Sequence, residues 1–154
     1  MANDVRIAAD RLDSPVGSAL VGELLTDLRT RYGAEDELDG LTADQLAPPS
    51  GIFLVAWDDV DAVGCGGFRR IDHDVAEIKR MYVVPTARRS GVARTVLAEI
   101  ETRARAGGYA RLILETGTMQ PEAMRLYETH GYEPMEPFGP YAASPLSRCY
   151  TKLL

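Results

Sequence analysis

The chain has 154 residues, 45% of them hydrophobic, and carries 17 lysines and arginines against 23 aspartates and glutamates, a net charge of −6. This length supports one hydrophobic core, and no long polar or Pro/Gly-rich tract divides it, so we expect residues 1–154 to form a single domain. The negative charge argues against a general nucleic-acid surface, and no apolar run approaches the roughly 18 residues of a membrane span, so neither nucleic acid nor a membrane is an expected partner.

The N-terminal segment and the cysteines indicate where the protein works. Residues 1–10 lack the charged and apolar zones of a signal peptide, which predicts a cytoplasmic protein. Cys65 and Cys149 lie in apolar, strand-like segments without Cys-x-x-Cys spacing, and the chain has only two histidines to complete a metal site. We therefore expect buried free thiols and no metal site, with a disulfide or a metal as the minor alternative.

The first predicted elements are a strand at residues 5–11 and a helix that begins at Ser14 and Pro15. Serine is a favoured N-cap, and proline is a favoured first helical residue. Apolar residues then recur at helical spacing until a tyrosine–glycine pair, which predicts a helix that covers a sheet. The acidic stretch at residues 34–50 is a predicted loop that contains a short helix at 42–46.

The next segment predicts three successive antiparallel strands. Apolar runs at residues 51–57 and 62–71 flank an acidic turn at 58–61, which is a hairpin pattern, and a further turn leads into a strand at 75–84. Three glycines surround Cys65 in the second run. They lack the following helix and the Gly-Lys-Ser/Thr of a Walker motif, so they favour a bulge or a close backbone contact over a phosphate loop.

The second half of the chain predicts a strand–helix–strand unit. Residues 91–107 carry apolar side chains at intervals of four until a glycine pair, and a short buried strand follows at 112–116. Crossover units of this kind are right-handed and join parallel strands. The strands at 75–84 and 112–116 are therefore expected to lie parallel and adjacent.

A last helix at residues 121–131 and closing strands at 132–135 and 148–153 complete the predicted fold. The fold class is α/β (α+β). We expect a mixed, mostly antiparallel sheet of six to seven strands with helices on both faces.

An arginine-rich loop joins the strand at 75–84 to the helix that follows it. Backbone N–H groups at a helix start favour an anion, guanidinium groups add full positive charge, and a glycine lets the backbone approach the ligand. The expected phosphate-binding residues are Arg88, Arg89, Ser90, Gly91, Val92, Ala93 and Arg94.

Two motifs carry a resemblance to a known family. The spacing Arg88-x-x-Gly91-x-Ala93 resembles the acyl-CoA-binding motif of the GNAT superfamily of N-acetyltransferases, written Gln/Arg-x-x-Gly-x-Gly/Ala. Residues 126–132, Leu-Tyr-Glu-Thr-His-Gly-Tyr, are similar to the superfamily's later Leu-Tyr-Glu-x-x-Gly-Phe/Tyr segment. Both motifs occur in the expected order with their strand and helix context. The resemblance implies acetyl-CoA as co-substrate and a splayed parallel pair of strands at the centre of the sheet.

The resemblance also implies roles for individual residues. Met81 and Val83 would pair through their main chains with the pantetheine arm of the cofactor. Tyr127 would contact the cofactor and protonate the departing thiolate; the alternative is a tyrosine that only packs, with its hydroxyl anchored by a hydrogen bond. Many relatives carry an asparagine that contacts the cofactor near position 120. Gln120 stands in its place and would make the same contact with a longer side chain, which departs from the family pattern.

A primary amine is protonated at neutral pH, so a general base would help the reaction. Glu77 is the first candidate, because a glutamate in this strand serves as base in some relatives, and strict alternation puts it on one side with Lys79 and Met81. The other interpretation is an ion pair between Glu77 and Lys79. Glu115, at the end of the next parallel strand, is the second candidate.

The leading hypothesis is an acetyl-CoA-dependent N-acetyltransferase that acts on a primary amine of a small molecule or peptide by direct attack in a ternary complex. The alternatives are a non-catalytic acyl-CoA-binding sensor or scaffold and a protein lysine or N-terminal acetyltransferase. Acceptor choice is expected to lie in the loops at 34–50 and 134–146, where Tyr141 could form an aromatic wall. Acidic residues at 35–39 and 58–61 suggest a cationic acceptor, or only solvated surface. The sequence leaves a homodimer open.

Overall fold

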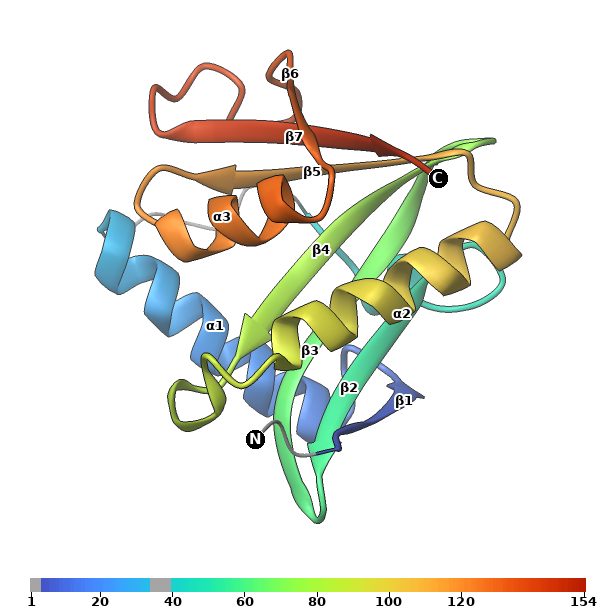
Figure 1. The fold of residues 1–154 in the computed structure, drawn as a ribbon, viewed down its shortest axis with the longest axis vertical. Helices are drawn as coiled ribbons and strands as arrows, with labels where there is room; N and C mark the ends of the chain where they lie inside the picture. Colours follow the sequence, from blue (N-terminus) through green and yellow to red (C-terminus); the bar gives the residue numbers. More distant parts are fainter. Residues whose placement is uncertain (1–3, 34–39) are drawn as a thin grey trace.

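The computed structural model describes residues 4–33 and 40–154, which form one seven-stranded sheet flanked by helices (Figure 1). The strands are β1 (Arg6–Asp10), β2 (Ile52–Asp58), β3 (Asp61–Asp72), β4 (Val75–Val83), β5 (Arg111–Gly117), β6 (Glu133–Met135) and β7 (Ser147–Leu153). The α-helices are α1 (Pro15–Tyr32), α2 (Val92–Ala106) and α3 (Pro121–Thr129), and 3₁₀ turns span Ala43–Leu46 and Pro85–Ala87.

The strand order is β1-β2-β3-β4-β5-β7-β6, and every neighbouring pair is antiparallel except β4 and β5, which are parallel. The predicted mixed, mostly antiparallel sheet with one central parallel pair is therefore confirmed. None of the helices within the described ranges combines the length and apolar character that a bilayer crossing needs.

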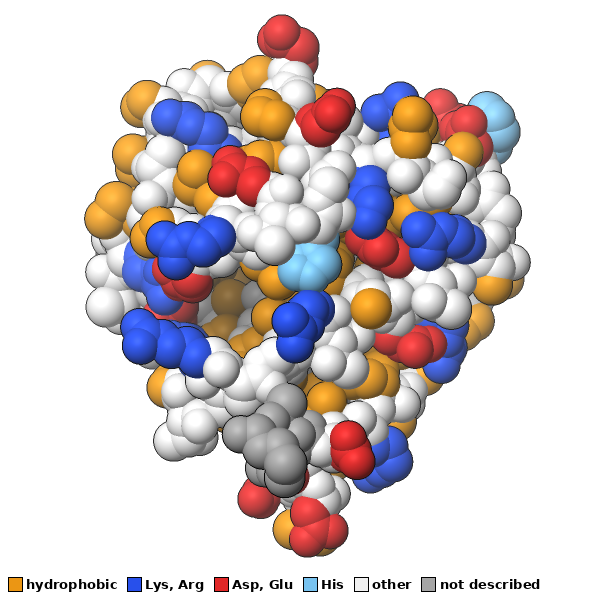
Figure 2. Space-filling model, viewed as in Figure 1, with side chains coloured by type: hydrophobic (Ala, Val, Ile, Leu, Met, Phe, Trp, Pro, Cys, Tyr) orange, Lys and Arg blue, Asp and Glu red, His pale blue; other side chains and the backbone are white. Residues whose placement is uncertain are grey.

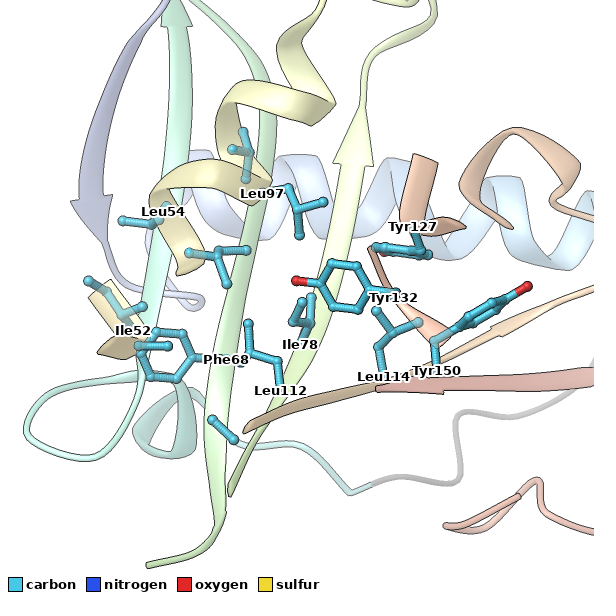
Figure 3. Close-up of a cluster of buried hydrophobic side chains, with 14 of the residues drawn as sticks. Ile52, Leu54, Phe68, Ile78, Leu97, Leu112, Leu114, Tyr127, Tyr132 and Tyr150 are labelled. Carbon is cyan, nitrogen blue, oxygen red and sulfur yellow. The ribbon is translucent and has the colours of Figure 1, made fainter. Parts of the chain in front are cut away.

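Two apolar layers hold the helices on the sheet. Leu20 and Leu24 of α1 pack with Phe53 and Val55 of β2 on one face. On the other face, α2 and α3 cover a larger cluster, to which Leu54 of β2 belongs (Figures 1 and 3). Successive residues of β2 thus serve opposite layers, as the alternation of side chains along a strand requires.

The alternation of β4 is interrupted by a bulge at Arg80. Lys79 pairs with Gly67 and Tyr82 with Cys65, so β4 advances three residues while β3 advances two. Arg80 is the extra residue of the bulge. Its φ of 63° lies in the left-handed region, which few non-glycine residues adopt.

The bulge overturns one expectation about side-chain direction. Ile78 before it and Met81 after it both pack in the layer under α2, so Glu77 and Lys79 face the opposite side of the sheet from Met81. The expected shared side for Glu77, Lys79 and Met81 is therefore wrong for Met81, because strict alternation does not hold across a bulge.

The glycine-rich part of β3 meets the bulge and α2. A Cβ on Gly66 would collide with the Met81 sulfur and lie 3.1 Å from Val96 of α2. The missing side chain therefore lets the helix pack directly on the strand. This confirms the prediction of a bulge or a close backbone contact in this segment.

The parallel pair separates soon after it begins. β4 and β5 pair from Val75–Arg111 to Glu77–Ile113, whereas β5 stays paired with β7 from Arg111 to Gly117. In Figure 1 the two strands diverge beyond this point. The divergence opens the centre of the sheet and creates space for a ligand.

We expect the free energy of unfolding to decrease above about pH 9. Burial raises the pKa of Cys65 from 9.0 to about 12, and burial together with a hydrogen bond to Glu128 raises that of Tyr150 from 10.0 to about 12. The unfolded chain loses these protons first, so this stabilisation is complete below pH 9.0 and is lost as the pH rises through 12.

Urea unfolding between about pH 8 and about pH 11 would measure this decrease. In a Cys65→Ala control the decline should be smaller, because only Cys149, whose pKa burial also raises, and the tyrosines remain to titrate. A midpoint that stays constant over this range would contradict the prediction.

Candidate active site

A cleft of about 1180 Å³ occupies the space between the diverging strands. Figure 2 shows it as a hollow with an apolar interior and lysine or arginine side chains around its mouth. Its walls come from the second half of α1, the end of β4, the arginine loop, the end of β5, α3 and the segment before β7. The residues predicted to bind the cofactor all line it: Met81, Val83, Arg88, Arg89, Ser90, Gly91, Val92, Ala93, Arg94, Gln120 and Tyr127.

The arginine loop ends at the N-terminus of α2. Gly91 is the N-cap with a φ of 88°, and Arg89 also lies in the left-handed region, with a φ of 65°. The first helical hydrogen bond runs from the Thr95 N–H to the Gly91 carbonyl at 3.0 Å. The three preceding amides therefore have no acceptor within the helix, so they and the helix dipole can hold an anion beside the guanidinium groups.

Arg88 has a different environment from the rest of the loop. Its Nε donates to the Val83 carbonyl at 2.9 Å, and its guanidinium lies 5.6 Å from the centre of the Tyr82 ring. These contacts fix Arg88 against the end of β4. Arg89 and Arg94 are consequently the better-placed arginines for a phosphate.

The end of β4 presents main-chain N–H groups to the cleft. The Val84 N–H donates to the Val63 carbonyl of β3 at 3.0 Å. Backbone groups alternate along a strand, so the N–H groups of Met81 and Val83 point away from β3, toward the gap left by β5. An extended chain of amides could pair with this edge as an added strand, although the Val83 carbonyl already accepts from Arg88.

Tyr127 enters the cleft from α3 and is only 5% exposed. Its ring lies edge-to-face on Tyr132, with centroids 5.6 Å apart. In the described part of the chain its hydroxyl has no hydrogen-bond partner, so the alternative of an anchored hydroxyl finds no support. Burial raises the pKa of Tyr127 above its ordinary value, which keeps the phenol protonated at neutral pH.

Thr116 is a cleft residue that the sequence did not reveal. Its hydroxyl oxygen is buried and, among the residues described, has no hydrogen-bond partner. Buried hydroxyls are normally satisfied, so this one fits a bound molecule with a polar group at that point. Amides in an extended ligand would supply such a group.

The end of α1 binds the β5–α3 connection and closes one side of the cleft. The Tyr32 hydroxyl donates to the Gln120 side-chain carbonyl at 3.0 Å, and Arg31 donates to the Met119 carbonyl at 2.9 Å and pairs with Glu122. A side chain on Gly117 would collide with the Tyr32 hydroxyl. Gln120 thus lines the cleft as predicted, but its amide oxygen is bound to α1.

Glu77 lies apart from the other predicted site residues. It is 4% exposed, it accepts a hydrogen bond from Arg69 Nε at 2.9 Å, and Lys79 Nζ is 3.9 Å away. It precedes the bulge, where β4 is still paired with β5, and it is not among the residues that line the cleft. The structure therefore does not bring the first candidate base to Tyr127, and Glu77 has an ion-pair environment.

Glu115 reaches the cleft at the end of β5. Leu112 and Leu114 belong to the layer under α2 and α3, so Glu115 faces the side of α1. Its carboxylate accepts a hydrogen bond from the Ser147 hydroxyl. Glu115 and Tyr127 therefore approach the cleft from opposite faces of the sheet.

The predicted acceptor features are only partly described. Tyr141 lines the cleft, in agreement with the idea of an aromatic wall. The acidic turn at 58–61 forms the β2–β3 hairpin and is absent from the cleft lining. The acidic segment 35–39 lies outside the described residues, so attraction of a cationic acceptor stays a prediction.

Comparison with known proteins agrees with this geometry. The sequence profile of the Acetyltransferase (GNAT) family matches residues 21–132. The chain is 41% identical over 140 residues to an "IAA acetyltransferase" from Azospirillum brasilense, with 88% of this chain and 90% of that protein covered.

Solved structures give the same fold. A proposed acyl-CoA N-acyltransferase from Klebsiella pneumoniae has a TM-score of 0.84 and 30% identity over 97% of each chain. A GNAT family acetyltransferase from Elizabethkingia anophelis, solved with acetyl-CoA bound, has a TM-score of 0.69 and 18% identity over 99% of each chain. The chain therefore belongs to the acetyltransferase (GNAT) family.

Proposed function

We propose that this protein transfers the acetyl group of acetyl-CoA to a primary amine of a small molecule or peptide, by direct attack in a ternary complex. One observation carries the proposal: the arginine loop, the N–H edge of β4 and the protonated Tyr127 line a single cleft. Acetyl-CoA bound to the Elizabethkingia protein of the same fold supports this choice of co-substrate.

The cleft offers each part of the coenzyme a matching partner. The pyrophosphate would contact Arg89, Arg94 and the free amides at the start of α2. The pantetheine amides would pair with the N–H groups of Met81 and Val83. The coenzyme supplies an activated acetyl thioester, and the protein supplies orientation and proton transfer.

Glu115 and Tyr127 would divide the proton transfers. Glu115, directly or through a water molecule, takes a proton from the acceptor ammonium, which frees the nitrogen lone pair. The nitrogen–carbon bond forms as the carbon–sulfur bond breaks, and Tyr127 gives its phenol proton to the sulfur. The acylated nitrogen then loses its second proton, which returns to the Tyr127 phenolate directly or through water, and Glu115 releases its proton to solvent. Their positions on opposite faces of the sheet suit an acceptor that enters from the α1 side.

Binding and turnover together test this function. Calorimetry with acetyl-CoA should detect binding, and a thiol reagent should detect release of coenzyme A with at least one member of a panel of small amines and peptides. Binding without release for the whole panel would favour the sensor or scaffold. Release with peptides alone would favour a protein acetyltransferase, and absence of binding would reject the proposal.

We expect Glu115→Gln to lower kcat/KM for the amine about a hundredfold at neutral pH, the size typical of a lost general base. This loss in kcat/KM should become smaller as the pH rises toward the pKa of the amine, because a larger fraction of the acceptor is then already deprotonated. Steady-state kinetics across pH would measure this, and the affinity for acetyl-CoA should not change.

Glu77→Gln is the matched control, since it also neutralises a glutamate on this face of the sheet. It should retain turnover but lose stability, because Arg69 would keep a buried charge without its partner. If Glu77→Gln removes turnover and Glu115→Gln does not, the base is Glu77.

A further inference from the structure

We propose that Tyr132 and Glu101 are positioning residues that hold the Tyr127 phenol in the cleft. This inference rests on the proposed function, in which Tyr127 donates a proton. It starts from an observation about Tyr127 itself: without a hydrogen bond inside the described structure, its hydroxyl is oriented only by how its ring packs.

Tyr132 packs against that ring, and Tyr150 lies tilted to it with centroids 6.3 Å apart. The Tyr127 and Tyr132 rings meet edge-to-face with an interplanar angle of 64°, and the Tyr132 N–H donates to the Tyr127 carbonyl at 3.0 Å. Figure 3 shows both rings, with Tyr150 beyond them, in the layer under α2 and α3. The orientation of Tyr127 therefore depends on whether Tyr132 keeps its place.

The Tyr132 ring is fixed by a buried carboxylate. Its hydroxyl donates to Glu101 Oε2 at 2.7 Å, and Glu101 is only 9% exposed. Lys152 of β7 donates to both Glu101 oxygens at 3.1 and 3.2 Å and to the His130 carbonyl at 2.8 Å. A buried charge is tolerated only when it is paired in this way, so the carboxylate is held firmly.

The network also connects the two ends of the reaction site. Glu101 belongs to α2, which begins at the arginine loop, whereas Tyr132 lies three residues after the end of α3, which carries Tyr127. The hydrogen bond between them therefore ties α2 to the segment that follows α3. Proton transfer is sensitive to such geometry, and small misplacements lower the rate strongly.

Tyr132→Phe tests the inference because it keeps the ring and removes only its anchor. We expect kcat to fall about tenfold, while KM for acetyl-CoA changes less than about twofold. In a Tyr127→Phe background the same change should have no further effect on kcat, because Tyr132 acts through Tyr127.

Tyr109→Phe is the matched control. Tyr109 is also buried, lies edge-to-face on Phe68 and donates its hydroxyl to the Ser50 carbonyl, but it does not line the cleft. It should lower stability and leave kcat unchanged. A second pair of variants covers the case in which Tyr132→Phe folds poorly: Glu101→Gln, which keeps an acceptor oxygen, should retain more of kcat than Glu101→Leu.

The outcomes separate this inference from the proposed function. If Tyr127→Phe lowers kcat but Tyr132→Phe does not, the positioning role is wrong and the proton donor stands. Independent, multiplicative losses in the double variant, or equal kcat for the two Glu101 variants, would also overturn the positioning role. If Tyr127→Phe keeps full kcat, the proton donor itself is wrong.

Discussion

Tyr127→Phe will lower kcat about a hundredfold or more, the usual loss when a general acid is removed, while the dissociation constant of acetyl-CoA stays within about twofold. The phenol is buried in the cleft and, among the described residues, without a hydrogen-bond partner. The change therefore removes the proton without breaking an existing contact. Stopped-flow or steady-state thiol release, combined with calorimetry, would measure both quantities.

The pH dependence of the wild-type enzyme gives a second check on Tyr127. Burial raises its pKa, so the acid form persists beyond the pH at which an ordinary tyrosine ionises. We expect no alkaline decrease in kcat from this group up to about pH 10.

Tyr150→Phe is the control. It removes a nearby hydroxyl that is bound to Glu128 at 2.7 Å, and it should keep most of kcat. Wild-type turnover in Tyr127→Phe would exclude the tyrosine as proton donor.

Arg89→Gln combined with Arg94→Gln will weaken acetyl-CoA binding about a hundredfold or more. Each charge-assisted hydrogen bond to a phosphate contributes on the order of 1.5–3 kcal/mol, and about 1.4 kcal/mol corresponds to a tenfold change in affinity. Glutamine remains polar but is shorter and uncharged, so the variant removes the positive charge together with the guanidinium hydrogen bonds. Calorimetric titration at two salt concentrations would also detect the smaller salt dependence expected for the variant.

Two controls make this result specific to the loop. Arg105→Gln removes the same charge from the exposed last turn of α2, outside the cleft, and should leave affinity unchanged. Arg88→Gln should have a smaller effect than the other two loop arginines, because its Nε is bound to the Val83 carbonyl. Unaltered affinity in the double variant would remove the arginine loop from the coenzyme site.

The candidate site illustrates which features a sequence can predict. The residues of the arginine loop were identifiable because their context is local: the loop joins a strand to a helix, and each pattern spans only a few turns. The predicted crossover of residues 75–84, 91–107 and 112–116 matches β4, α2 and β5 closely for the same reason. Tyr127 was singled out only through the resemblance of residues 126–132 to a family motif. The raised pKa of Tyr127 was not predictable, because its burial depends on residues from several elements.

The choice between Glu77 and Glu115 shows a case in which a local sequence pattern does not predict the direction of a side chain. Alternation along residues 75–84 predicted one side for Glu77 and Met81, but the bulge at Arg80 depends on how β4 pairs with β3. The sequence of one strand does not show whether it has an extra, bulged residue relative to the strand that it pairs with. The described structure therefore favours Glu115, which shares the cleft with Tyr127, as the base to test first.

By itself, the sequence determined the order of the elements, the arginine loop before α2 and the presence of a tyrosine on the last helix, because periodicity and capping are properties of neighbouring residues. Only the tertiary structure decided which groups meet. Tyr32 and Gln120 are 88 residues apart, and Tyr132 and Glu101 are 31 apart, yet each pair is joined by one hydrogen bond. Such contacts arise when helices pack on a splayed sheet, and no spacing in the chain encodes them.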